Sequence, residues 1–252
     1  MKISVIGSVK IDSRWRRKLF LYNLDSFDIV SEILYWRVNI VGKYADFVKE
    51  EILKRYKNAV VTTDDDSSYY EVTKNQLQGS QYDIVLFWEE DNWFLCSSKY
   101  IFLYLLSEFE KSSAEVLTIS HLITSWKTKK LLPVTGKENY LYGEYKVDKE
   151  SQKKVWEKYS EAYLTGISAI YKKQLALEAL EFTKPYIKDQ KSARQFELSR
   201  EKGEKFLEKR SFIEMIPTVQ VIREVFRFHT VDRIISFRKA KQVLKLRDKG
   251  YL

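Results

Sequence analysis

Short apolar segments rich in β-branched residues alternate with amphipathic segments over the first 120 residues, and this alternation constrains the fold more than any other feature. Each apolar segment has the length and composition of a buried strand. Strands are expected at residues 2–9, 33–41, 58–63, 82–88 and 115–120. Helices are expected between them at residues 44–56, 68–77 and 99–111. Such alternation predicts an α/β fold with a mainly parallel central sheet and helices on both faces.

The fourth of these strands runs directly into a cluster of carboxylates. Residues 82–88 are followed by Glu89, Glu90 and Asp91. Ligands of α/β sheets bind at the carboxyl ends of the strands, so this cluster is expected to face a binding crevice. Carboxylate oxygens suit Mg²⁺ or Mn²⁺, and such a cation can hold a diphosphate. The alternative interpretation is a strand that ends in a solvated acidic turn.

Length and cysteine content limit the class of protein. A chain of 252 residues, 44% of them hydrophobic, can bury a sizeable core, either of one large α/β domain or of a domain with an appendage. The single cysteine, Cys96, excludes an intrachain disulfide, and the chain does not start with a secretion signal. The apolar stretch 100–106 is far too short to cross a membrane. We therefore expect a cytoplasmic protein, soluble or peripheral at the inner face of the cell membrane.

Other ligand sites are excluded by what the sequence lacks. One cysteine and two histidines, His121 and His229, cannot supply a zinc ligand set. The sequence contains neither a P-loop nor a G-x-G-x-x-G motif. Nucleotide binding by those two routes is therefore not expected.

The charge balance points to an anionic partner. The formal net charge is +9 and the isoelectric point is about 9.3. A phosphorylated substrate, a membrane surface and nucleic acid all fit this sign. Residues 231–249 resemble a basic amphipathic helix. This helix is expected either to lie on an anionic membrane or to pack on the domain or on a second subunit of a homodimer.

The second half of the chain is less regular. Residues 121–150 contain a proline and two glycines among lysines and tyrosines, which indicates a loop with a hairpin over the site. A helix is expected over residues 172–182, and residues 211–230 have an extended pattern. We expect a catalytic domain at 1–210, with a nucleotide-binding half at about 1–120 and an acceptor half at about 121–210. A basic helical extension at 211–252 follows it.

The order of several motifs resembles one enzyme family. A helix with the pair Lys74-Asn75 is followed by Gly79, by the strand 82–88 and by the acidic residues 89–91. Further on come the segment 164–173 and the sequence Arg-Gln-Phe-Glu-Leu-Ser at 194–199. This order is similar to that of the GT-A fold glycosyltransferases, in particular the inverting family 2. The chain departs from the family where Glu-Glu-Asp replaces Asp-x-Asp and where Asn39 stands near the expected acidic residue of the second strand.

The resemblance implies roles for individual residues. Glu89 and Asp91, with His229, would hold a divalent metal, Mn²⁺ or Mg²⁺. Glu197 would be the catalytic base, with Asp189 as the second choice. The donor, most simply a UDP-sugar, would be bound by a set from the first half of the chain: Ser8, Asp64, Asp65, Lys74, Glu90, Trp93 and His121. Several have a structural alternative: N-capping explains Asp64 and Asp65, and a helical surface explains Lys74 and Glu197. Trp88 is expected in the core.

These features together predict a function. The chain is expected to be a metal-dependent, inverting glycosyltransferase that moves a sugar from a nucleotide diphosphate to a glycan or lipid-linked glycan. One alternative is a nucleic-acid-binding protein or a DNA-directed sugar transferase. A second alternative is a catalytically silent relative that binds glycans.

Overall fold

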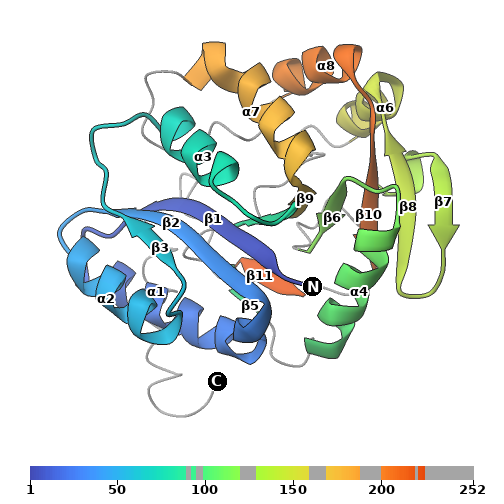
Figure 1. The fold of residues 1–252 in the computed structure, drawn as a ribbon. Coiled ribbons are helices and arrows are strands. Elements are labelled where there is room, and N and C mark those ends of the chain that lie inside the picture. The colour runs from blue at the N-terminus through green and yellow to red at the C-terminus, as the bar shows by residue number, and fades with distance from the viewer. Residues whose placement is uncertain are drawn as a thin grey trace.

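The computed structural model describes residues 1–88, 92–94, 99–119, 129–158, 169–187, 200–218 and 221–224. Within these ranges a nine-stranded sheet, in the order β3-β2-β1-β4-β9-β6-β10-β8-β7, lies between two layers of helices, and β11 pairs with β5 (Figure 1). The strands are β1 (Ile3–Lys10), β2 (Leu34–Val41), β3 (Val60–Thr62), β4 (Ile84–Phe87), β5 (Asn92–Phe94), β6 (Val116–Thr118), β7 (Val134–Glu138), β8 (Tyr142–Val147), β9 (Ala169–Lys172), β10 (Phe212–Pro217) and β11 (Ile222–Glu224). The helices are α1 (Arg14–Phe27), α2 (Ala45–Arg55), α3 (Tyr69–Gln78), α4 (Lys99–Lys111), α6 (Lys149–Lys158), α7 (Lys173–Ile187) and α8 (Arg200–Lys209), with short 3-10 helices η1 (Asp28–Ile33) and η3 (Lys129–Leu131).

The amino-terminal half of the sheet is parallel. β1 pairs in parallel with both β2 and β4, and β3 extends the sheet beyond β2. The carboxyl ends of these four strands therefore lie at one edge of the sheet. The β1–β2 ladder runs from Ile3↔Leu34 to Lys10↔Val41, whereas β1 pairs with β4 only over residues 4–6. Within the described ranges, residues 7–10 of β1 pair only with β2, and residues 37–39 of β2 pair in turn with β3.

The second half of the sheet is mixed. β9 runs antiparallel to both β4 and β6, β10 runs parallel to β6, and β8 and β7 complete the sheet as an antiparallel hairpin. A hairpin within residues 121–150 is confirmed, but its expected place over the site is wrong, because β8 and β7 lie at the opposite edge of the sheet from β3, β2 and β1. The predicted α/β class is confirmed as well. The antiparallel direction of β9 was not evident from the sequence, because a buried strand has the same apolar pattern in either direction.

Two apolar cores hold the helices against the two faces of the sheet. One core joins side chains of α1, α2 and α4 to the sheet, and the other joins side chains of α3, α6, α7 and α8 to the opposite face (Figure 1). Alternate residues of β1 contribute to the two cores, as expected for a strand that is covered on both sides. Helices therefore cover both faces, as the sequence predicts.

Trp88, directly after β4, is a core residue. Its side chain is only 3% exposed. The ring makes edge-to-face contacts with Phe20 of α1 and Trp36 of β2, at centroid distances of 5.4 Å and 5.1 Å. Its indole Nε1 donates a hydrogen bond of 2.9 Å to Oδ1 of Asn23. The prediction that Trp88 packs in the core is confirmed.

The caps at two element ends are well defined. Ser68 caps α3 in a reciprocal capping box with Glu71, so the expectation that Asp64 or Asp65 caps this helix is wrong. Gly42 ends β2 with φ of +98°, a backbone conformation that favours glycine. The loop between β3 and α3 therefore has a defined end at Ser68.

No helix in the described ranges is long and apolar enough to cross a membrane. Residues 225–252 lie outside those ranges, and they include the predicted amphipathic helix at 231–249.

Candidate functional site

Asn39, at the carboxyl edge of β2, joins three strands through its side-chain amide. Its Nδ2 donates to the backbone oxygen of Asp64 over 2.7 Å and lies 3.4 Å from Oγ of Ser8. Its Oδ1 accepts from the backbone nitrogen of Asp64 over 2.9 Å and from Oγ1 of Thr62 over 2.8 Å. Asn39 is only 1% exposed. The ends of β1, β2 and β3 are therefore fixed to one another by a buried side chain.

This geometry explains why an amide stands where the family resemblance predicts an acid. An ionised carboxylate accepts hydrogen bonds but cannot donate one. Asn39 must do both, because it pairs with the backbone nitrogen and the backbone oxygen of Asp64. The consequence is a β3–α3 loop whose start is held in place by the sheet.

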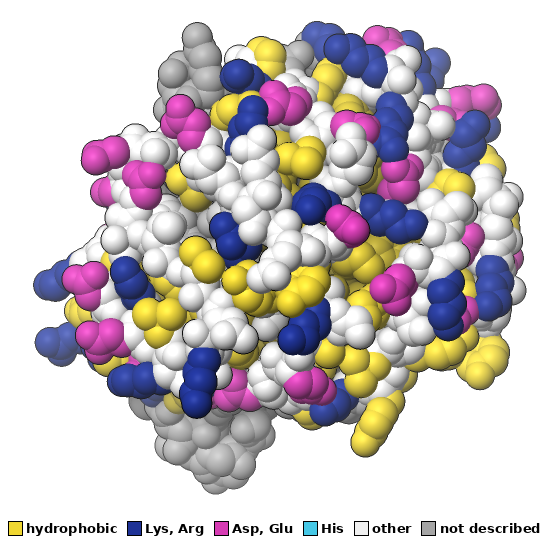
Figure 2. Space-filling model, in the orientation of Figure 1, with side chains coloured by type: hydrophobic (Ala, Val, Ile, Leu, Met, Phe, Trp, Pro, Cys, Tyr) yellow, Lys and Arg dark blue, Asp and Glu magenta, His cyan; other side chains and the backbone are white. Residues whose placement is uncertain are grey.

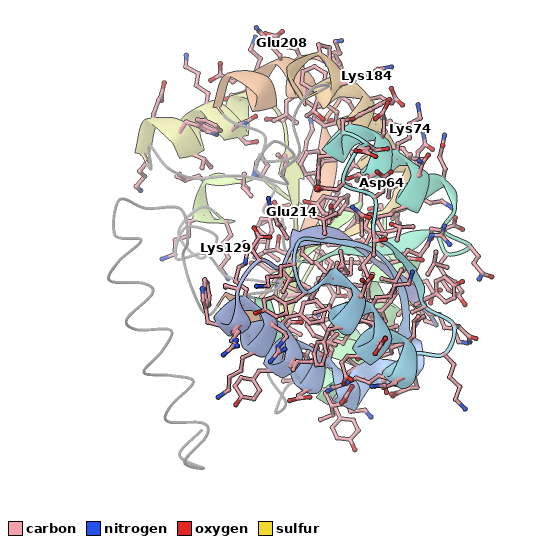
Figure 3. All side chains as sticks on the ribbon, turned by 90° about the vertical axis from the view of Figure 1, so that its left-hand side faces the viewer. Asp64, Lys74, Lys129, Lys184, Glu208 and Glu214 are labelled. Atoms are coloured by element: carbon pink, nitrogen blue, oxygen red, sulfur yellow. The ribbon has the colours of Figure 1, made fainter. Side chains whose placement is uncertain are left out.

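The β3–α3 loop carries the two exposed carboxylates predicted to bind the donor. Oδ1 of Asp64 accepts hydrogen bonds from the backbone nitrogens of Asp66 and Ser67, at 3.0 Å and 2.9 Å. This turn uses one carboxylate oxygen of Asp64 to shape the loop. Asp64 and Asp65 are both exposed. Figure 3 shows Asp64 in this loop, below the start of α3.

Backbone atoms of β1 and β4 come together beside this loop. Nε2 of Gln76 in α3 donates to the backbone oxygen of Gly7 over 2.8 Å. A Cβ on Gly7 would lie 2.5 Å from the backbone oxygen of Trp88, so only glycine fits there. Ser8, the predicted donor-binding residue, follows directly and is partly exposed. The structure thus brings Ser8 and Asp64 to the same edge, close to Trp88, after which the acidic segment begins in the sequence.

Lys74 makes its contacts elsewhere. Its Nζ donates to Oε1 of Glu181 in α7 over 2.7 Å and to the hydroxyl of Tyr70 over 3.1 Å. The hydrogen bond that Lys74 donates to Glu181 is the main cause that raises the pKa of Lys74, and the same bond lowers the pKa of Glu181. Lys184 lies over the Tyr70 ring, 5.1 Å from its centroid. Lys74 therefore links α3 to α7 (Figure 3), and its role toward a donor stays a prediction.

A buried carboxyl group, which sequence reasoning missed, lies in β10. Glu214 is 4% exposed and its carboxyl group is hydrogen-bonded to the hydroxyl of Thr118, the last residue of β6. Burial raises the pKa of Glu214 to about 7, and the Thr118 hydrogen bond offsets only part of this shift. Burial also raises the pKa of the neighbouring Tyr171, and the charge of Glu214 adds to that increase. The available signal was an acid inside the apolar run Phe212–Pro217.

Several predicted site residues lie outside the described ranges: Glu89, Glu90, Asp91, His121, Asp189, Glu197 and His229. Trp93 is described only as part of β5, where it pairs with Arg223 of β11. Along the chain, residues 89–91 connect the end of β4 to β5. Within the described ranges, no group of three or more His, Cys, Asp or Glu side chains could hold a metal ion.

The fold and its carboxyl-edge site define a protein of the GT-A-like α/β class. Comparison with solved structures finds S. aureus TarS, residues 1–349, with a TM-score of 0.53 and 14% identity over 88% of this chain. The same protein in complex with UDP-GlcNAc gives a TM-score of 0.52 at 14% identity over 88% of this chain. The chain spans 60% and 58% of those two TarS chains. Neither protein-family models nor curated proteins give a match. At this identity the likeness establishes the shared fold.

Proposed function

We propose that the chain is a glycosyltransferase that takes a sugar from a UDP-sugar and transfers it to a glycan or lipid-linked glycan. The observation that carries this proposal is the Asn39 network, which fixes Ser8 and Asp64 at the carboxyl edge of a GT-A-like sheet. TarS, which has the same fold, has been solved with UDP and with UDP-GlcNAc. That precedent supports a uridine nucleotide as the ligand.

Donor binding would use polar groups that the fold holds in place. The carboxylates of Asp64 and Asp65 are exposed and can accept hydrogen bonds from the N–H of a uracil ring. The hydroxyl of Ser8 lies 3.4 Å from the Asn39 amide and can reach the same ligand. Because the loop is already ordered by Asn39, binding would cost little conformational entropy. Lys74, Glu90, Trp93 and His121 remain predicted contacts of the donor.

A divalent metal, Mn²⁺ or Mg²⁺, is proposed at Glu89 and Asp91, with His229 as a third ligand. The two carboxylates supply the hard oxygen donors that these ions prefer. Bound there, the metal would neutralise charge on the diphosphate. The support for this site is that residues 89–91 come next in the sequence after Trp88, whose backbone oxygen lies beside Gly7, the residue before Ser8.

The proposed reaction is a single displacement with inversion. Glu197, or in its place Asp189, would accept the proton of the acceptor hydroxyl while its oxygen forms the new bond to the anomeric carbon. The bond from that carbon to the diphosphate oxygen breaks at the same time, and UDP leaves with the electron pair. Peripheral attachment to an anionic membrane through residues 231–249, and a homodimer, remain predictions about partners.

Thermal unfolding with nucleotides tests this function. UDP with Mn²⁺ is expected to raise the melting temperature, because a ligand at 100 times its Kd stabilises the folded state by about 2.7 kcal/mol. For a domain of this size that corresponds to roughly 5–10 °C. CMP, GDP and UDP without Mn²⁺ are expected to give smaller shifts.

Two variants of the β3–α3 loop make the thermal test specific. Asp64→Asn keeps an oxygen for the two loop hydrogen bonds but removes the charge, so the UDP shift is expected to fall. Asp66→Asn changes an exposed neighbour and is expected to keep the full shift. If UDP raised the melting temperature equally in both variants, Asp64 would not be a donor contact. If UDP did not raise the melting temperature of the unmodified protein, the proposed function would be wrong.

A further inference from the structure

We propose that Asn23 and Ser26 of α1 are positioning residues of the donor site, because they hold the two residues that flank its acidic segment. Trp88 comes directly before residues 89–91, and Phe94 ends β5 after them. This inference rests on the proposed glycosyltransferase function and adds the side chains that keep its acidic segment in place. Neither Asn23 nor Ser26 was predicted from the sequence to belong to the site.

Asn23 holds the residue that precedes the acidic segment. Its Oδ1 accepts the 2.9 Å hydrogen bond from the indole of Trp88, and Asn23 itself is fully buried. The backbone nitrogen of Trp88 also donates to the oxygen of Ile6 over 2.9 Å, next to Gly7 at the donor edge. Trp88 is therefore fixed through its side chain by α1 and through its backbone by β1.

Ser26 holds the residue that ends β5. The backbone nitrogen of Phe94 donates to Oγ of Ser26 over 2.9 Å, and the Ser26 hydroxyl donates in turn to the backbone oxygen of Asn23 over 2.6 Å. Ser26 and Phe94 are both buried. The ring of Phe94 also packs on Phe27, the next residue of α1, with 5.7 Å between the ring centroids. One turn of α1 therefore holds both flanks of the acidic segment.

Apolar packing alone does not explain two polar side chains at these positions. Their buried neighbours along α1 are apolar, namely Phe20, Leu24 and Phe27. A buried polar group is unfavourable unless it is hydrogen-bonded, and a hydrogen-bonded buried network fixes one arrangement of the elements that it joins. Asn23 and Ser26 therefore add to this core a fixed relation between Trp88 and Phe94.

Fixed flanks restrict the chain between them. Five residues separate Trp88 from Phe94, and the first three of them are Glu89, Glu90 and Asp91. A short chain whose two ends are held has far fewer conformations than a free one. Its carboxylates then lose less conformational entropy when a cation and a diphosphate bind. Removing an anchor is therefore expected to weaken metal binding.

Surface charge does not single out a place for a diphosphate on the face shown in Figure 2, where Lys and Arg side chains are interspersed with Asp and Glu. The polar order around the acidic segment is internal instead, on the side of α1 that packs on the sheet (Figure 1). Neutral replacements of Asn23 and Ser26 leave the surface charge unchanged. Any change in binding that they cause would therefore not arise from long-range electrostatics.

The test measures the Kd of Mn²⁺ in the presence of UDP by electron paramagnetic resonance, which detects free Mn²⁺. Ser26→Ala removes the oxygen that accepts from Phe94. Its Kd for Mn²⁺ is expected to rise by about tenfold, the low end of the loss when a group that orients metal ligands is removed. Asn23→Leu removes the acceptor of the Trp88 indole and is expected to raise the Kd at least as much. Ser26→Thr keeps a hydroxyl and is expected to restore most of the affinity.

Thr183 of α7 offers a matched control. Its buried hydroxyl donates to the backbone oxygen of Leu180, three residues earlier, over 2.9 Å, as the Ser26 hydroxyl does to Asn23. α7 lies on the opposite face of the sheet from α1. Thr183→Val is expected to lower the melting temperature by an amount similar to Ser26→Ala and to leave the Kd for Mn²⁺ unchanged. Should Asn23→Leu fail to fold, Ser26→Ala and this control still decide.

Hydrogen exchange measured by mass spectrometry gives a second readout, without metal or nucleotide. The backbone amides of residues 89–93 are expected to exchange faster in Ser26→Ala than in the unmodified protein, because one flank of the segment is released. In Thr183→Val the same amides are expected to exchange at the unmodified rate.

Other outcomes would overturn the proposal. If Ser26→Ala and Thr183→Val bound Mn²⁺ equally well, or if exchange at residues 89–93 were the same in both, Asn23 and Ser26 would only pack the core. The unmodified protein separates the two levels. If it bound neither UDP nor Mn²⁺, the proposed function itself would be wrong. If it bound both and Ser26→Ala bound them equally well, only the positioning role would be wrong.

Discussion

Replacing Asp91 by asparagine is expected to lower turnover by about 100- to 1000-fold, the loss typical when a group that stabilises transition-state charge is removed. The variant keeps the size of the side chain and removes the charge that the proposed metal requires. Turnover is measured as UDP release from a UDP-sugar in the presence of an acceptor and Mn²⁺. The melting temperature is expected to stay within about 2 °C of the unmodified protein, as for a surface change.

Asp83 offers the control for this experiment. It precedes β4, whereas Asp91 comes after β4 in the sequence, and its side chain is 97% exposed with a 3.5 Å ion pair to Lys173. Asp83→Asn removes one carboxylate from the residue just before β4. It is expected to leave turnover unchanged. If Asp91→Asn were as active as the Asp83 control, the metal assignment to this acidic segment would be wrong.

Replacing Glu214 by glutamine is expected to stabilise the protein at alkaline pH. The folded protein holds the pKa of Glu214 near 7, above its usual value of 4.5. Below pH 4.5 the group is protonated in both states and has no effect. Between pH 4.5 and 7 the unfolded chain ionises more readily, so stability is lost as the pH rises. The difference corresponds to about 3 kcal/mol, which the variant is expected to recover at pH 8.

Urea unfolding at pH 5 and pH 8 measures this effect. The variant and the unmodified protein are expected to differ by less than about 1 kcal/mol at pH 5 and by about 3 kcal/mol at pH 8. Glu208→Gln is the control, because Glu208 is an exposed carboxylate whose pKa is lowered by Lys149. Its removal is not expected to change the pH dependence in this range. If the free energy of unfolding of Glu214→Gln and of the unmodified protein changed in parallel with pH, the pKa of Glu214 would not be raised in the folded protein.

The sequence predicted the elements of the sheet better than their directions. Periodic segments with clear ends, such as α2 beginning after Gly42 and α3 ending at Gly79, lie within two residues of their predicted bounds. The direction of β9 depends on a long connection whose path is a tertiary property. The α/β class was predictable because alternation of strands and helices is a property of the sequence itself.

The candidate site was predictable only in part. Ser8, Asp64 and Asp65 were selected because they follow strands, and the structure brings Ser8 and Asp64 to one edge. Asn39 was noted as a departure from the family, but its two-way hydrogen bonding with Asp64 needed coordinates. Glu214 escaped attention because a single acid in an apolar run gives no indication of its partner. Lys74 fits a helical surface and a phosphate site equally well by sequence, and only the structure reveals its bond to Glu181.

A crystal structure with UDP and Mn²⁺ tests the central claim most directly, which is that the carboxyl edge of β1, β2 and β3 binds the donor nucleotide. The account predicts uridine density against Ser8 and the Asp64–Asp65 turn, with the diphosphate directed toward residues 89–91. The account would be contradicted if UDP at saturating concentration bound elsewhere. It would also be contradicted if no UDP density appeared at the strand ends around Asn39 in a fully soaked crystal.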